Sequence, residues 1–114
     1  MKYLLLNYDD EQAGAKAAET EMPGWFEVTE RMAKSGKMLG GEGLKETSTA
    51  TTVRKRDGKL STSDGPFAET KEQLCGFFLI EARDLDEAIE LAGKFPHIHR
   101  GSVEIRPVRV FSEE

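Results

Sequence analysis

The fold is decided by one apolar stretch, Leu74-Cys75-Gly76-Phe77-Phe78-Leu79-Ile80-Glu81-Ala82. Alternate side chains of a strand point to opposite faces of its sheet. Both sets are apolar here, with Leu74, Gly76, Phe78 and Ile80 in one and Cys75, Phe77 and Leu79 in the other. A strand that is apolar on both faces is typically covered on both. The stretch therefore predicts the most buried strand of the sheet.

The segment before this strand is polar and reads Asp64-Gly65-Pro66-Phe67-Ala68-Glu69-Thr70-Lys71-Glu72. The dipeptide Gly65-Pro66 after an aspartate is typical of a turn. This loop places a carboxylate, an aromatic ring and three more charged side chains at the entrance to an apolar interior. We expect a functional site there if the protein has one.

The rest of the chain alternates between strand and helix patterns. We expect strands at 2–8, 37–44, 49–56, 59–63, 74–82 and 102–110, helices at 22–35 and 84–95, a loop at 9–19 and a tail at 112–114. Asp57-Gly58 is a strong hairpin signal. Three glycines in the strand at 37–44 predict a bulge or the close approach of another backbone.

Both helices show apolar side chains at helical spacing. In the first, this stripe consists of Met22, Trp25, Phe26, Thr29, Met32 and Ala33. Thr20 is its predicted N-cap, and Gly36 ends it. The second helix begins with Asp84 and Glu87, which have the spacing of a capping box, and it ends before Pro96.

This order of elements predicts an α+β fold, a ferredoxin-like split βαβ arrangement with an inserted β-hairpin. Two helices cover only one face of such a sheet. The strands at 2–8 and 74–82 are apolar on both faces, so the open face would be a large exposed apolar patch. A second copy packed sheet to sheet would cover it. We therefore expect a homodimer, a dimeric α+β barrel.

Composition narrows the class of protein further. The chain has 114 residues, enough for one domain, and a net charge of −5. That charge predicts no direct nucleic-acid binding, because phosphate contacts need a basic surface. A single cysteine, Cys75, no signal peptide and no membrane-length apolar segment favour a cytoplasmic location. Cys75 itself is expected to be a buried, inert thiol.

Asp64 is the first candidate catalytic residue. A carboxylate at the rim of an apolar cavity has a raised pKa and can act as a general acid or base. The alternative is that Asp64 only forms an Asx turn that sets the loop.

His97 and His99 are the second candidates, because residues i and i+2 share a face in extended backbone. One of them would be the catalytic partner of Asp64. A transition-metal site with Asp64 or Glu42 is a further option, as are two plain surface histidines. We expect neither a metal nor a cofactor. The expected ligand-binding residues are Trp25, Glu42, Phe67 and Lys71, of which Trp25 and Phe67 would form walls.

The segment 64–74, followed by Gly76-Phe77, closely resembles the signature of DGPF-type proteins of the YCII-related family. Further resemblances lie in Met1-Lys2-Tyr3, Gly40-Gly41-Glu42-Gly43-Leu44, Thr49-Ala50-Thr51-Thr52-Val53-Arg54, Asp84-Leu85-Asp86-Glu87-Ala88 and Gly101-Ser102-Val103-Glu104-Ile105-Arg106-Pro107. The resemblance covers nearly the whole chain and implies a single domain over 1–114 and a dimeric α+β barrel.

The resemblance implies no single activity. Some relatives are thought to use a His–Asp pair in a cleft, a few are small-molecule enzymes such as dehydrochlorinases, and some are linked to alternative sigma factors. Asp64 matches the aspartate of the motif. The histidine that relatives carry in the first helix region has no counterpart here, where Trp25 stands in that stretch.

Two functions remain open from the sequence. The first is a small-molecule pocket beside the DGPF loop, with acid–base chemistry by Asp64 in an elimination or isomerisation. The second is a non-catalytic accessory or regulatory protein that contacts a sigma factor. Whether the protein is an enzyme stays open at this point.

Overall fold

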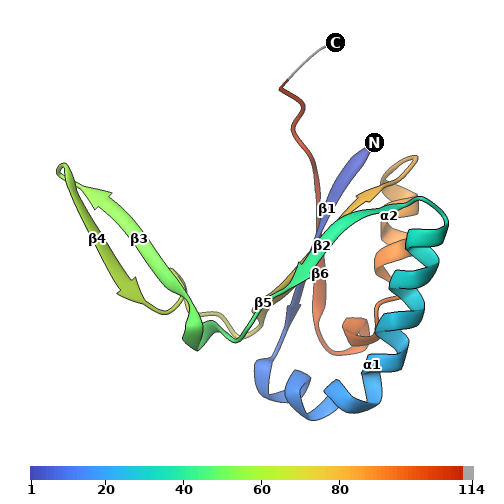
Figure 1. Ribbon diagram of the computed structural model, residues 1–114, viewed down its shortest axis with the longest axis horizontal. Helices are drawn as coiled ribbons and strands as arrows, with labels where there is room; N and C mark the ends of the chain where they lie inside the picture. The colour runs from blue at the N-terminus through green and yellow to red at the C-terminus, as the bar shows by residue number, and fades with distance from the viewer. Residues whose placement is uncertain (112–114) are drawn as a thin grey trace.

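The chain forms a four-stranded antiparallel sheet with both helices on one face, and a separate hairpin projects from it (Figure 1). The computed structural model describes residues 1–111, so the tail expected at 112–114 lies outside the described residues. The strands are β1 (Lys2–Asp9), β2 (Met38–Gly43), β3 (Thr51–Arg56), β4 (Lys59–Asp64), β5 (Gln73–Glu81) and β6 (Ser102–Pro107). The helices are α1 (Glu11–Lys34) and α2 (Leu85–Ala92), with short 3₁₀ turns η1 (Thr47–Thr49) and η2 (Pro96–His99).

The order of strands in the main sheet is β2-β5-β1-β6, and every neighbouring pair is antiparallel. This confirms the predicted α+β fold, a ferredoxin-like split βαβ arrangement with an inserted β-hairpin. Strand β5 lies at the centre, as its two apolar faces predict. It pairs with β1 along its whole length, with Leu5 opposite Phe78 and Leu6 opposite Phe77.

The core lies between this sheet and the two helices. Its largest fully buried side chains are Leu5, Ile80, Phe95 and His97. Side chains alternate along β1, so Tyr3 and Leu5 are buried under the helices while Leu4 and Leu6 point to the opposite face and are partly exposed. Figure 1 shows no helix on that opposite face.

Helix α1 begins eleven residues earlier than its apolar stripe predicts, so the loop expected at 9–19 is wrong. The N-cap is Asp10, whose carboxylate accepts a hydrogen bond from the Ala13 amide at 2.9 Å. Thr20, the expected cap, lies inside the helix and donates to the Ala17 carbonyl. The alanine-rich segment after Asp10 has high intrinsic helix propensity, which outweighs its lack of an apolar stripe.

Helix α2 begins as predicted, with the Asp84 carboxylate accepting from the Glu87 amide at 2.9 Å. The Glu87 carboxylate accepts from the amide of Arg83, one residue before the cap. The helix ends at Ala92, earlier than expected, and η2 follows. Strand β6 likewise ends at Pro107 rather than at 110.

The hairpin of β3 and β4 is a separate sheet. Its turn is Asp57-Gly58, and both residues have positive φ, as the sequence predicts. Every residue of the two strands is exposed except Thr52, which is partly buried. In Figure 1 the hairpin extends away from the helices and the main sheet.

Strand β2 contains both features predicted from its glycines. Its register with β5 shifts between Met38 and Gly40. A Cβ at Gly41 would lie 2.6 Å from the carbonyl oxygen of Phe77, so the neighbouring backbone leaves no room for a side chain there.

Candidate functional site

A cavity of about 480 Å³ lies between the N-terminal half of α1 and the adjoining ends of β1, β2 and β5. This volume is in the range of small-molecule sites. Its apolar wall includes Ala15, Ala18, Met22, Trp25 and Phe78. Its polar lining includes Asn7, Asp9, Cys75, His97 and Arg100.

Strand β1 carries two polar side chains into this cavity. Asn7 and Asp9 continue the alternation of Tyr3 and Leu5, so they face the helices and are buried. The apolar side chains earlier on this face, Tyr3 and Leu5, pack in the core and so position the strand. The polar side chains of Asn7 and Asp9 come at the end of the strand, next to the start of α1. The end of β1 therefore delivers an amide and a carboxylate to the cavity.

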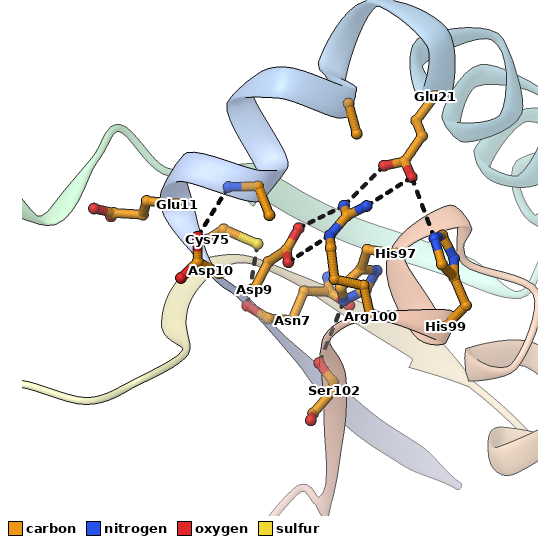
Figure 2. Close-up of polar contacts among 12 residues, drawn as sticks. Asn7, Asp9, Asp10, Glu11, Glu21, Cys75, His97, His99, Arg100 and Ser102 are labelled. Carbon is orange, nitrogen blue, oxygen red and sulfur yellow. Dashed lines mark hydrogen bonds and ion pairs between the residues drawn. The ribbon is translucent and has the colours of Figure 1, made fainter.

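Arg100 lies between Asp9 and Glu21 and bonds both carboxylates (Figure 2). Its Nε and Nη2 donate to the two oxygens of Asp9 at 2.9 and 2.8 Å. Its Nη1 and Nη2 donate to the two oxygens of Glu21, both at 3.0 Å. These bonds lower the pKa of Asp9 and of Glu21 and raise the pKa of Arg100. All three groups are ionised at neutral pH.

His97 is 1% exposed and lies in η2, where the backbone turns from α2 towards β6. Its Nε2 is 3.3 Å from the carbonyl oxygen of Ser102. A carbonyl only accepts, so Nε2 carries the hydrogen and Nδ1 of the neutral ring is a bare acceptor. Burial lowers the pKa of His97, which favours this neutral form. Nδ1 has no hydrogen-bond partner among residues 1–111.

Aromatic rings hold the imidazole in place. Trp25 stacks on His97 with ring centroids 5.3 Å apart, and Phe95 stacks on it at 6.4 Å. Trp25 also contacts Phe95 and Phe78. The ring of His97 is therefore fixed between α1 and η2, with one nitrogen engaged and the other free.

Cys75 lines the cavity and is half-buried. Its thiol donates to the backbone carbonyl of Asn7 at 3.3 Å. Burial raises the pKa of Cys75, so the group is a thiol rather than a nucleophilic thiolate. This agrees with the inert thiol expected from the sequence.

The structure brings three of the predicted site residues to this cavity, namely Trp25, Glu42 and His97. The others lie outside its lining. Asp64 is exposed at the end of β4, Phe67 is 79% exposed, Lys71 is exposed, and the side chain of His99 is 66% exposed.

The expected pairing of Asp64 with His97 or His99 is therefore not present within one chain. The hairpin forms its own sheet, so the end of β4 is not held against η2. The carboxylate nearest to His99 is Glu21, with Oε2 3.9 Å from its Nε2. The expectation that His97 is a surface residue is also wrong. The catalytic roles of Asp64, His97 and His99 stay predictions.

Sequence reasoning missed Asn7, Asp9, Glu21 and Arg100. Asn7 and Asp9 had a signal, because they occupy the same face as Tyr3 and Leu5 and so put polar groups on an apolar strand face. No sequence pattern pointed to Arg100, because its carboxylate partners Asp9 and Glu21 lie 91 and 79 residues away in the sequence.

Among residues 1–111, no group of three or more His, Cys, Asp or Glu side chains is arranged so that it could hold a metal ion. Neither helix in the same range has the length and apolar character needed to cross a membrane.

Comparisons with known proteins agree with this architecture. An uncharacterised protein of Rhizobium meliloti (strain 1021) is 36% identical, with 97% of this chain and 94% of that protein covered. A solved structure of 5-chloro-2-hydroxyhydroquinone dehydrochlorinase from Burkholderia phenoliruptrix AC1100, in complex with 2,5-dihydroxybenzoquinone, has a similar fold. Its TM-score is 0.51 at 13% identity, with 96% of this chain and 94% of that chain covered. The family model of the YCII-related domain matches residues 1–112, and the chain belongs to the YCII-related family.

Proposed function

We propose that the protein binds a small organic molecule in the cavity between α1 and the sheet, and that His97 Nδ1 accepts a proton from it. The observation that carries this proposal is a buried, neutral imidazole beside a cavity of ligand size, whose Nδ1 has no hydrogen-bond partner among residues 1–111. Structural histidines in a core normally have both nitrogens satisfied, because an unpartnered buried polar atom costs free energy.

The surroundings of His97 suit a proton acceptor. The Ser102 carbonyl fixes its tautomer, and Trp25 and Phe95 fix its ring plane. The carboxylate of Asp9, ionised and held by Arg100, would stabilise the imidazolium that forms after proton transfer. The reaction class that fits these groups is proton transfer in an elimination or isomerisation, which needs no metal or cofactor.

The structurally similar dehydrochlorinase supplies a first probe, because its structure contains 2,5-dihydroxybenzoquinone. The apolar wall of the cavity, with Trp25 and Phe78, suits a flat ring of this size. This compound is therefore the first ligand to test for binding.

A pair of matched variants tests whether the cavity binds ligands. Ala18→Trp places a large ring in the cavity, whereas Ala33→Trp places the same ring on α1 outside it. Aromatic compounds, including the quinone, are titrated into ¹⁵N-labelled protein, and the Trp25 indole signal is followed. We expect binding to wild type and Ala33→Trp and its loss in Ala18→Trp. Equal binding to all three, or no binding to any, contradicts the proposal.

The role of His97 is tested with His97→Gln, which keeps a polar side chain but removes the basic nitrogen. We expect ligand affinity to fall about tenfold, the effect of losing one buried hydrogen bond. Any turnover found with a bound ligand should fall in kcat more than in KM, because a proton acceptor acts in the transition state. Unchanged affinity and unchanged kcat would exclude His97 from the site.

We also propose that two copies assemble through the open face of the sheet. The support is a row of apolar side chains on β1 and β5 that neither α1 nor α2 covers, Leu4, Leu6, Phe77 and Leu79. The roles of Asp64, Phe67 and Lys71 beside a cavity stay predictions. The sigma-factor alternative and the cytoplasmic location stay predictions.

A further inference from the structure

The hairpin of β3 and β4 is not packed against the body of its own chain. It forms a sheet of its own and extends away from the helices and the main sheet (Figure 1). Within its two strands only Thr52 is partly buried. A hairpin of two strands is marginally stable in water, because it buries little apolar surface. An ordered hairpin of this kind therefore needs a second surface to pack against.

One face of the hairpin, defined here as the basic face, consists near the turn of Arg54, Arg56 and Lys59. Arg56 lies directly opposite Lys59 in the ladder, so their side chains share a face. Arg54 shares that face, because it lies two residues along the same strand. Within residues 1–111 none of the three has an ion-pair partner. Like charges directly opposite each other destabilise a strand pair, so the basic face favours a negatively charged surface.

Carboxylates gather at the base of the same hairpin, where η1 leads into β3. The side chains of Asp10, Glu11 and Glu46 line the entrance half of the cavity, and we call them the acidic rim. They lie close together, because a carboxylate oxygen of Glu11 accepts from the amide of Thr47 at 2.7 Å. Over the described part of the chain the acidic rim, too, has no ion-pair partner. The hairpin is therefore basic at its tip and acidic at its base.

These two ends do not meet within one chain. Each strand of the hairpin has 6 residues and is about 20 Å long. Two hairpins related by a two-fold axis can lie antiparallel, and each tip then faces the base of the other. A two-fold interface uses the same patch of both copies, which suits a segment whose two ends carry opposite charge.

We propose that the basic face of the hairpin docks on the acidic rim of a second copy, and that the second copy does the same in return. Each cavity then has the hairpin tip of the other copy at its entrance, so the site is complete only in the pair. The inference rests on the proposed function in one respect, because it requires the assembly of two copies.

A nucleic acid is the competing occupant of a basic face. The whole chain has a net charge of −5, although the hairpin has more basic than acidic side chains. The body of the molecule is therefore acidic and repels a phosphate backbone, whose binding depends on neutralising cations. The same acidic body attracts the hairpin of a second copy, and this favours the pair.

Carbodiimide cross-linking tests the proposal, because it joins a lysine amine to a carboxylate in direct contact. The protein is treated at micromolar concentration and low ionic strength, where screening is weak. The product of twice the chain mass is isolated from a denaturing gel and mapped by mass spectrometry. We expect links from Lys59 to the acidic rim. Lys55 is the internal control, because it lies opposite Leu60 on the other face of the same hairpin and should give several-fold fewer links.

Matched variants give a second measurement. Arg56→Glu reverses a charge on the basic face and should reduce the Lys59 links to the rim several-fold. Lys55→Glu makes the same kind of change on the opposite face and should leave them unchanged. The double variant Lys59→Glu with Glu46→Lys exchanges the two charges and should restore a link between the same two positions. These positions are exposed, so the variants leave the core intact.

The outcomes separate this inference from the proposed function. A single-chain mass for wild type in sedimentation overturns both the proposed assembly and the docking of the hairpin. If two copies form but Lys55 links to the rim as often as Lys59, the assembly stands and the docking is wrong. If a short DNA duplex removes the Lys59 links and binds less tightly to Arg56→Glu, the basic face is a nucleic-acid surface and the inference is overturned.

Discussion

Arg100 donates to both oxygens of Asp9, from Nε at 2.9 Å and from Nη2 at 2.8 Å, across 91 residues of sequence. This two-point contact fixes the turn after α2 against the end of β1. The same guanidinium holds Glu21 of α1, so three segments meet at one side chain. The positions of Asn7 and His97 in the cavity depend on this junction.

Replacing the arginine at this junction should lower stability clearly. Arg100→Met leaves Asp9 and Glu21 facing each other without a cation, and we expect a loss of about 2 kcal/mol in the free energy of unfolding. Urea denaturation measures this value. The control is Arg31→Met, which breaks an exposed pair with Glu27 on α1 and should cost less than about 0.5 kcal/mol. Equal losses of unfolding free energy in the two variants would show that the Arg100 junction stabilises the fold no more than an exposed ion pair does.

The same junction predicts how stability depends on pH. The pKa values of Asp9 and Glu21 are lower in the folded protein than in the unfolded chain, where they are about 3.9 and 4.3. Folding stability from these groups is therefore full above about pH 5 and is lost as the pH falls through the lower, folded values. Urea denaturation between pH 2.5 and pH 6 should give a steeper decline for wild type than for Arg100→Met. Parallel curves would contradict the assignment of the decline to this pair.

The turn that carries His97 has no room for a side chain at Gly101. A Cβ there would lie 2.2 Å from the carbonyl oxygen of Tyr8 and 2.9 Å from Cδ2 of His97. Gly101→Ala must push β1 and η2 apart, and we expect a loss of about 2–3 kcal/mol in the free energy of unfolding. Gly40→Ala is the matched control, because nothing lies within 4 Å of its Cβ position and its φ is not positive. If Gly101→Ala leaves the free energy of unfolding unchanged, the wall of the cavity adjusts easily to the added side chain.

The proposed homodimer makes a prediction about two leucines. Leu6 lies on the open sheet face opposite Phe77, and Leu60 is 70% exposed on the hairpin. Leu6→Glu should prevent assembly, since a buried unpaired charge in an apolar interface is costly, while Leu60→Glu should leave it intact. Sedimentation at micromolar concentration should show twice the mass of one chain for wild type and Leu60→Glu, and one chain for Leu6→Glu. A single-chain mass for wild type contradicts sheet-to-sheet assembly, and loss of assembly only in Leu60→Glu would move the interface to the hairpin.

The sequence by itself determined the topology of this protein. The two apolar faces of β5, the Asp57-Gly58 turn and the Asp84 cap are local signals, because each depends on neighbours within a few residues. Even the misplaced start of α1 had a local cause, the Asp10 cap, which the apolar stripe from Met22 concealed.

The arrangement of the site was decided by the tertiary structure. His97 and Asp64 have the right chemistry for a pair, yet the separate hairpin keeps Asp64 out of the cavity and η2 buries His97 beside Asn7 and Asp9. Side-chain chemistry can be read from the sequence, but a site depends on distances between segments up to 91 residues apart. Those distances are set by how the helices pack on the sheet, and no local pattern encodes them.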